Sequence, residues 1–234
     1  MGFAQDVGNL IKLADKRFGL LSVLKGEPRP PAGGFDLKGE KALDWGWVCV
    51  NLPKCAKRGL DIGCGESPTV PAMLSLNYGE VVAVDLQFPL DKQLKGPHFV
   101  QGDINELPLT PGFDVIVACS AVEHIGLSGR YGSGEDVDGD LKAMRKIKTL
   151  LSKDGVLILT IPAGRDAVYK PWHRVYGKKR IQDLLSGFRI KKSEGYVKEP
   201  WGPWAKSTLD EALEFSATPV RYALAQMVLT VEAK

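Results

Sequence analysis

The chain of 234 residues has no apolar run long enough to cross a membrane as a helix and no excess of charge of either sign. Its 31 basic and 28 acidic residues leave a net charge of +3, so we expect neither nucleic acid nor a membrane surface as a partner. The four cysteines show no C-x-x-C spacing, and the N-terminus lacks the apolar core of a secretory signal. These absences predict a cytoplasmic protein with reduced thiols.

The amino-acid composition, with 44% hydrophobic and 25% charged residues, is typical of a soluble globular protein. Apolar residues at steps of three and four over residues 3–21 predict a helix, and residues 26–34 form a proline- and glycine-rich linker. A second helix is predicted over residues 39–52, and we expect Pro53 to end it. We therefore divide the chain into an N-terminal extension, residues 1–53, and a main domain, residues 54–234.

The most informative segment is LDIGCGESP at residues 60–68, which enters a Gly-x-Gly loop from an apolar strand. Twenty residues after Gly65, the apolar run VVAVDL ends near Asp85. A strand, a glycine loop, a helix and a second strand with a terminal carboxylate form a unit that binds an adenosine-containing cofactor. Gly63 and Gly65 allow the backbone to lie against the ligand, and Asp85 can accept hydrogen bonds from ribose hydroxyls. A tight turn without a ligand is the alternative.

The glycine loop departs from the dinucleotide fingerprint G-x-G-x-x-G because Pro68 stands where the third glycine would be. Glu66 lies in the loop and Asp61 just before it. Carboxylates at these places would repel a pyrophosphate but tolerate a cationic ligand with an amino group. The charge pattern therefore favours S-adenosylmethionine over NAD.

At this point the sequence resembles the class I S-adenosylmethionine-dependent methyltransferases. The resemblance covers about residues 58–164 and rests on the motif at 60–65, Asp85, the segment FVQGDINELPL at 99–109 and the strands expected within 113–126 and 155–164. It implies an α/β fold: a Rossmann-like three-layer sandwich whose seven-stranded, mostly parallel sheet ends in an antiparallel strand, which residues 221–233 fit. The cofactor-binding residues that it implies are Asp61, Gly63, Cys64, Gly65, Asp85, Leu86, Asp103, Ile104 and Ser120.

Three side chains are candidates for removing a proton from the methyl acceptor. His124 follows the fourth expected strand, where the methyl group would point in the resembled family, and Glu123 precedes it. His173 lies in the aromatic segment 164–180, which follows the fifth strand. A histidine can accept a proton near neutral pH, although either ring can equally have a structural role. The candidates for binding the substrate are Arg130, Tyr131, Trp172, Arg174 and Tyr176.

Four carboxylates, Glu135, Asp136, Asp138 and Asp140, lie within six residues ahead of a helix predicted at 141–151, which Gly155 would end. Capping of this helix by Asp138 or Asp140 is the preferred explanation, and a Mg²⁺ site is the alternative, so we assign no metal ligand. Further along, residues 198–207 are expected to form a loop, followed by a helix that Ser207 and Asp210 would cap.

The sequence therefore predicts methyl transfer from S-adenosylmethionine, with O-methylation of a small molecule or sugar as the expected reaction. The alternatives are N-methylation of a small amine, an NAD-dependent oxidoreductase, and a cofactor-binding module without catalysis. The expected partner is a small-molecule or glycan substrate, and the sequence is compatible with a monomer or a homodimer.

Overall fold

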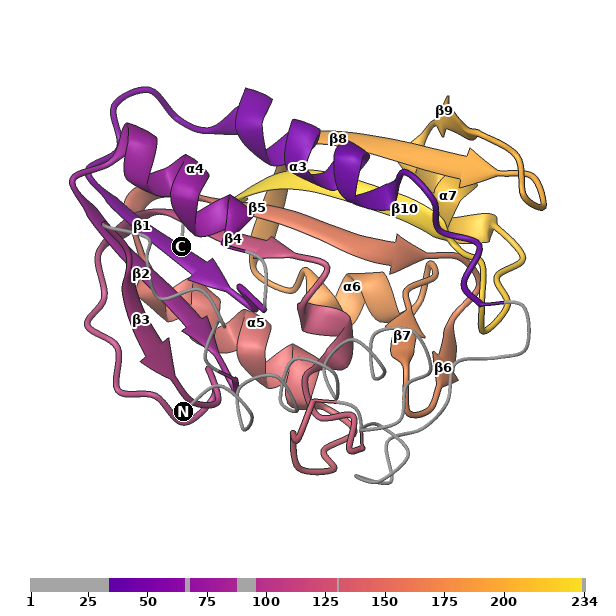
Figure 1. Cartoon of the computed structure of the whole chain (residues 1–234), viewed down its shortest axis with the longest axis horizontal. Coiled ribbons are helices and arrows are strands. Elements are labelled where there is room, and N and C mark those ends of the chain that lie inside the picture. The colour runs from indigo at the N-terminus through magenta and orange to yellow at the C-terminus, as the bar shows by residue number, and fades with distance from the viewer. Residues whose placement is uncertain (1–33, 66–67, 88–95, 130, 233–234) are drawn as a thin grey trace, which may run out of the picture. The chain divides into compact units, whose positions relative to one another are not determined.

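The computed structural model describes residues 34–232 apart from 66–67, 88–95 and 130 (Figure 1). The chain divides into two units between Gly34 and Phe35. Nearly all the described residues belong to the second unit. The helix expected at 3–21 and all of the linker expected at 26–34 except Gly34 lie outside the described residues. No helix of the described part is both long and apolar enough to cross a membrane.

A sheet of eight strands organises the second unit, in the order β3-β2-β1-β4-β5-β10-β8-β9 (Figure 1). The first five strands in this order are parallel, and β10 lies antiparallel between β5 and β8. In chain order, the strands of this sheet are β1 (Arg58–Ile62), β2 (Glu80–Asp85), β3 (His98–Gln101), β4 (Phe113–Cys119), β5 (Leu151–Ala163), β8 (Phe188–Lys198), β9 (Trp204–Ser207) and β10 (Ala223–Val231). The predicted antiparallel last strand is thus confirmed in β10.

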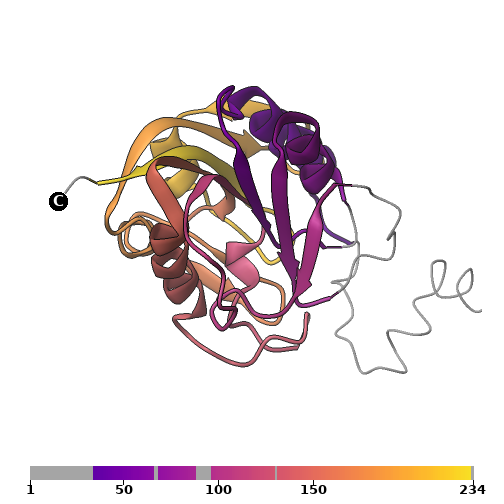
Figure 2. The same cartoon turned by 90° about the vertical axis from the view of Figure 1, so that its left-hand side faces the viewer.

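Helices cover both faces of the sheet, as Figure 2 shows, so the predicted three-layer architecture is confirmed. The helices are α3 (Glu40–Asn51), α4 (Thr69–Asn77), the short 3-10 helix η1 (Val122–His124), α5 (Gly139–Leu150), α6 (Arg180–Leu184) and α7 (Leu209–Glu214). Side chains alternate across β4, so Val115 and Val117 pack with α3 and α4 while Ile116 and Ala118 pack with α5. This alternation places one apolar core on each face.

Helix α3 packs in the same core as the sheet, although the sequence places it in the extension. Trp47 and Val48 of α3 are buried against Leu74 of α4 and against Val115 and Ile158 of the sheet. Each side chain of this size stabilises the fold by about 1.5–3 kcal/mol when fully buried. The second unit accordingly begins at Phe35, ahead of α3.

The sheet has one strand more than the seven expected, because part of the loop predicted at 198–207 is a strand. Residues Trp204–Ser207 form β9 and pair with β8 at the sheet edge, with Val197 opposite Ala205. Four residues without alternating polarity give too weak a pattern to recognise in the sequence. The aromatic segment 164–180 likewise contains a small hairpin, β6 (Ala167–Tyr169) and β7 (His173–Val175).

Two predicted helix boundaries are wrong. Helix α5 ends at Leu150, and Gly155 lies inside β5, where an added Cβ would come within 2.7 Å of the Phe113 carbonyl oxygen. The capping box of α7 is formed by Thr208 and Glu211, one residue beyond the predicted pair Ser207 and Asp210. Serine and threonine are adjacent here, and only the backbone conformation decides which of them caps the helix.

Candidate active site

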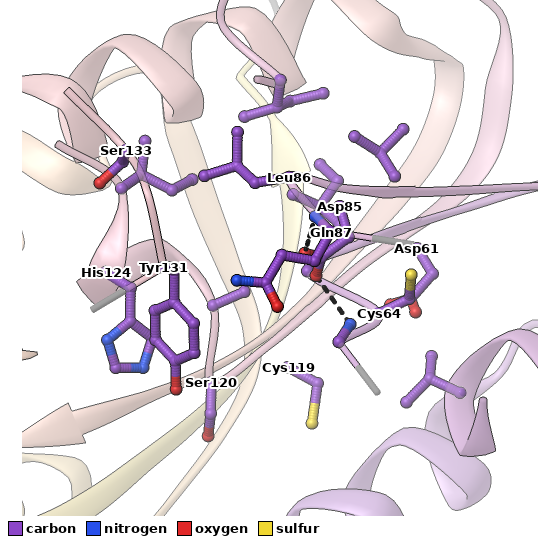
Figure 3. A pocket seen from close by; sticks show the side chains of 18 of the residues that line it. Asp61, Cys64, Asp85, Leu86, Gln87, Cys119, Ser120, His124, Tyr131 and Ser133 are labelled. Carbon is purple, nitrogen blue, oxygen red and sulfur yellow. Dashed lines mark hydrogen bonds between the residues drawn. The ribbon is translucent and has the colours of Figure 1, made fainter. Parts of the chain in front are cut away.

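A cavity of about 530 Å³ opens where strands β1, β2 and β4 end at their carboxyl termini (Figure 3). This edge of a parallel sheet is where open α/β folds bind ligands. All nine residues that the sequence predicts for cofactor binding line the cavity. The cavity is also lined by His124 and Tyr131 from the predicted catalytic and substrate-binding sets.

The glycine loop after β1 approaches the backbone of the neighbouring strands closely. The Gly63 amide donates to the Val84 carbonyl over 2.8 Å, and Gly63 adopts a φ of +79°. A Cβ at Gly63 would lie 2.4 Å from the Cβ of Ala121, so no other residue fits without moving the segment after β4. Glycine at this position therefore allows the loop to pack closely against the segment after β4.

Asp85, at the end of β2, has a carboxylate with a fixed orientation. One oxygen accepts from the Gly65 amide over 2.7 Å and the other from the Gln87 amide over 2.9 Å, as Figure 3 shows. Each carboxylate oxygen has a further lone pair for a ligand. Asp85 can therefore accept two hydrogen bonds from a diol without turning.

Asp61, inside β1, is 1% exposed, and its Oδ2 atom has no hydrogen-bond partner in the structure. Burial raises the pKa of Asp61 to about 8, and the nearby charge of Asp85 adds to this effect. A buried carboxylate without a donor is costly to maintain. The cavity thus contains a carboxylate suited to a cationic donor group.

The two cysteines of the cavity wall are poor nucleophiles. Burial raises the pKa of Cys64 to about 12, with further contributions from Asp61 and Asp85. Burial also raises the pKa of Cys119 well above its ordinary value. Both thiols therefore stay protonated at neutral pH, which disfavours a covalent cysteine mechanism.

The helix η1 directs His124 toward the cavity, where its ring meets Tyr131 edge-on at 4.9 Å between centroids (Figure 3). Its Nδ1 atom lies 2.7 Å from the Trp172 carbonyl oxygen, so Nδ1 carries the proton and the neutral ring has its lone pair on Nε2. The Nε2 atom lies 3.6 Å from an oxygen of Glu123. The hydrogen bond to the Trp172 carbonyl therefore fixes the tautomer of His124.

The other two predicted catalytic residues, Glu123 and His173, do not line the cavity. Glu123 is 1% exposed, and burial raises its pKa to about 8. His173 is buried in β7, packed edge-on against Tyr222 and Tyr169. Glu123 keeps a contact with His124, whereas His173 has the surroundings of a core residue.

The structure does not bring the other described candidates for substrate binding into the cavity. Arg174 is 2% exposed and donates to backbone carbonyls, including those of Ile125 and Asp136. Tyr176 is fully buried and donates to Asp140, and Trp172 presents its carbonyl to His124. These groups hold η1 and the segment before α5 in place. Their polar atoms are therefore satisfied by hydrogen bonds within the protein rather than by a ligand in the cavity. Arg130 lies outside the described residues.

The acidic stretch before α5 is held by basic side chains. Glu135 pairs with Lys170, Asp136 with Lys142 at 2.6 Å, and Asp140 with Arg180 at 2.5 Å. Asp138 occupies the N-cap position of α5, but its side chain makes no capping hydrogen bond. Among the described residues, no group of three or more His, Cys, Asp or Glu side chains is placed to hold a metal ion.

Lys41, Trp45, Gln87 and Ser133 are among the residues of the cavity lining that were not predicted. Lys41 and Trp45 belong to α3, which precedes the glycine loop in the chain and forms part of the cavity wall. Gln87 could have been found because it follows Asp85 closely. No signal in the sequence marks the residues of α3, since only tertiary packing brings this helix to the cavity.

Comparisons with known proteins agree with this geometry. The family model described as "Caenorhabditis protein of unknown function, DUF268" matches residues 104–200, and no curated protein matches the chain. The N-methyltransferase NodS from Bradyrhizobium japonicum WM9, solved with S-adenosylhomocysteine, is similar with a TM-score of 0.57 at 15% identity, covering 84% of this chain and 88% of that one. The 1,6-didemethyltoxoflavin-N1-methyltransferase from Burkholderia thailandensis has a TM-score of 0.59 at 16% identity, covering 98% and 89%. The chain thus has the fold of the class I S-adenosylmethionine-dependent methyltransferases.

Proposed function

We propose that this chain is an S-adenosylmethionine-dependent methyltransferase. The observation that supports the proposal best is the buried Asp61 oxygen without a partner, next to the Gly63–Gly65 loop and the oriented carboxylate of Asp85. A ligand with an ammonium group, a ribose diol and an adenine ring suits these groups. NAD suits them less well, because its pyrophosphate would face the carboxylates.

Each part of such a cofactor has residues that could hold it. Asp61 would accept from the ammonium group and Asp85 from the ribose hydroxyls. Asp103 and Ile104, which line the same cavity, would contact the adenine. The glycine loop would lie under the methionine part. S-Adenosylmethionine supplies a methyl group on a sulfonium sulfur that is ready for in-line displacement.

We further propose a small molecule or a sugar as the acceptor, methylated on oxygen. His124 would accept the hydroxyl proton on Nε2, because the Trp172 carbonyl holds the ring in the tautomer with this atom unprotonated. The acceptor oxygen would form its bond to the methyl carbon as the carbon–sulfur bond breaks, leaving S-adenosylhomocysteine. The Glu123 carboxyl lies 3.6 Å from Nε2, and an imidazolium at this distance would lower the pKa of Glu123, which burial raises to about 8, and so favour its ionised form.

N-methylation of a small amine is the second candidate. Two structurally similar proteins are N-methyltransferases by name, and the acidic surroundings of His124 would tolerate an amine. A neutral amine needs less help from a base than a hydroxyl does, so the two reactions differ in their dependence on His124.

The experiment that tests the function is transfer of a labelled methyl group from S-adenosylmethionine to paired acceptors. Glucose would be compared with glucosamine, and 4-ethylphenol with tyramine. Labelled product from both members of a pair supports O-methylation, and product from the amines alone supports N-methylation. Absence of any transfer, with S-adenosylhomocysteine bound, would favour a cofactor-binding module.

A further inference from the structure

Ser120, the residue that follows β4, has an unusual backbone conformation in the cavity wall. Its φ is 49°, a value that glycine adopts readily but serine does not. The Ser120 amide is held by the backbone oxygen of Thr160 at 3.0 Å and by its hydroxyl at 3.1 Å. Strained conformations of this kind persist where surrounding contacts enforce them, and they gather at ligand sites.

The Ser120 side chain is held by Asp44 of α3, a residue 76 positions earlier in the chain. The Ser120 hydroxyl donates to Oδ2 of Asp44 over 2.7 Å. Asp44 is fully buried, and its other oxygen accepts from Gln226 of β10 over 3.2 Å. Lys41, one turn earlier on α3, lies 3.7 Å from the same carboxylate. Asp44 thus joins α3 and β10 to the end of β4.

The direction of this hydrogen bond determines what Ser120 can offer to a ligand. Because the hydroxyl proton is donated to Asp44, the Ser120 oxygen can only accept from a further partner. The charge on Asp44 polarises the hydroxyl and strengthens such an acceptor. Ser120 lines the cavity, so the group that it would accept from is an ammonium or hydroxyl donor on the bound cofactor.

We propose that Asp44 is a positioning residue of the cofactor site, acting through Ser120 to keep that hydroxyl oriented as an acceptor. The inference rests on the proposed function, because it needs a cofactor in the cavity. It adds a residue that the cofactor motifs do not contain and that itself does not line the cavity. It also gives α3 a role in cofactor affinity.

The test is a double-mutant cycle on the full chain, measured as the dissociation constant of S-adenosylhomocysteine by calorimetry. We expect Asp44→Ala and Ser120→Ala each to weaken binding about tenfold, and the double variant to be weakened no further. Asp44→Asn, which can still accept the Ser120 hydrogen bond, should restore most of the affinity. Tyr222→Phe is the control, because it removes a buried hydrogen bond to Glu40 on the same helix without touching Ser120.

The control should lower the melting temperature and leave the dissociation constant unchanged. Wild-type affinity in Asp44→Ala, or a hundredfold loss in the double variant, would overturn the inference while the proposed function stands. If the wild-type chain does not bind S-adenosylhomocysteine, the proposed function fails and the inference fails with it. If Asp44→Ala does not fold, the cycle uses Asp44→Asn, and full additivity with Ser120→Ala then overturns the inference.

Discussion

The two ends of the cavity differ in how the chain assembles them. The glycine-loop end comes from one continuous βαβ region, in which the Gly63–Gly65 loop and Asp85 are linked by a hydrogen bond across twenty residues. The other end, around His124, brings together α3, the turn at Ser120 and the helix η1, with a contact between residues 76 positions apart. The first end can be recognised as a local motif, whereas the second exists only after the sheet and helices have packed.

The largest effect is expected from Gly63→Ala, which should abolish cofactor binding. The new Cβ would meet Ala121 at 2.4 Å, and alanine is strained at a φ of +79°. We expect S-adenosylhomocysteine to bind at least about 100-fold more weakly, or roughly 3 kcal/mol, by calorimetry. Gly79→Ala, where an added Cβ meets no atom within 4 Å, should bind normally. Equal affinities in the two variants would refute the close approach of the loop.

His124→Ala addresses the other end and should separate catalysis from cofactor binding. Loss of a general base lowers the rate of O-methylation by about 100-fold or more, measured as kcat with labelled cofactor. The affinity for S-adenosylhomocysteine should stay close to that of the wild type. His98→Ala, on the exposed edge strand β3, serves as the matched control. An unchanged kcat in His124→Ala would show that this ring is not the base.

Asp85→Ala should weaken cofactor binding by about 1.5–3 kcal/mol, the range for a hydrogen bond to a charged group. Isothermal titration with S-adenosylhomocysteine measures this loss. Asp114→Ala is a suitable comparison, because Asp114 accepts from the amides of Lys57 and Arg58, at the start of β1 rather than at the cavity. That variant should be less stable yet bind normally. Unchanged affinity in Asp85→Ala would remove the ribose assignment.

The smallest expected signal is a proton released on binding. Because burial raises the pKa of Asp61 to about 8, this carboxyl is mostly protonated at pH 7 in the free protein. An ammonium group beside it lowers that pKa, so binding releases a fraction of a proton to the buffer, which titrations in buffers of different ionisation enthalpy detect. Asp61→Asn should release none from this site. Proton uptake, or equal release from the variant, would contradict the assignment.

The sequence predicted the glycine-loop end of the cavity well and the end around His124 poorly. All nine predicted cofactor residues line the cavity, because the glycine loop and strand ends are determined by short-range patterns. Arg174 and Tyr176 were expected at the substrate, but they are buried and bound to η1 and α5. Their polarity in the sequence did not reveal whether a ligand or the protein would satisfy it. No pattern in the sequence indicated that Asp44 and Lys41 belong to the site, because their positions depend on how α3 packs.

The most direct test of the central claim is calorimetric titration of the purified chain with S-adenosylhomocysteine and, separately, with NAD. We predict saturable binding of S-adenosylhomocysteine, none of NAD, and loss of the signal in Gly63→Ala. Binding of NAD alone would contradict this prediction, because the carboxylates of Asp61 and Asp85 would then face a pyrophosphate. Binding of neither ligand would leave the methyltransferase fold without the proposed cofactor.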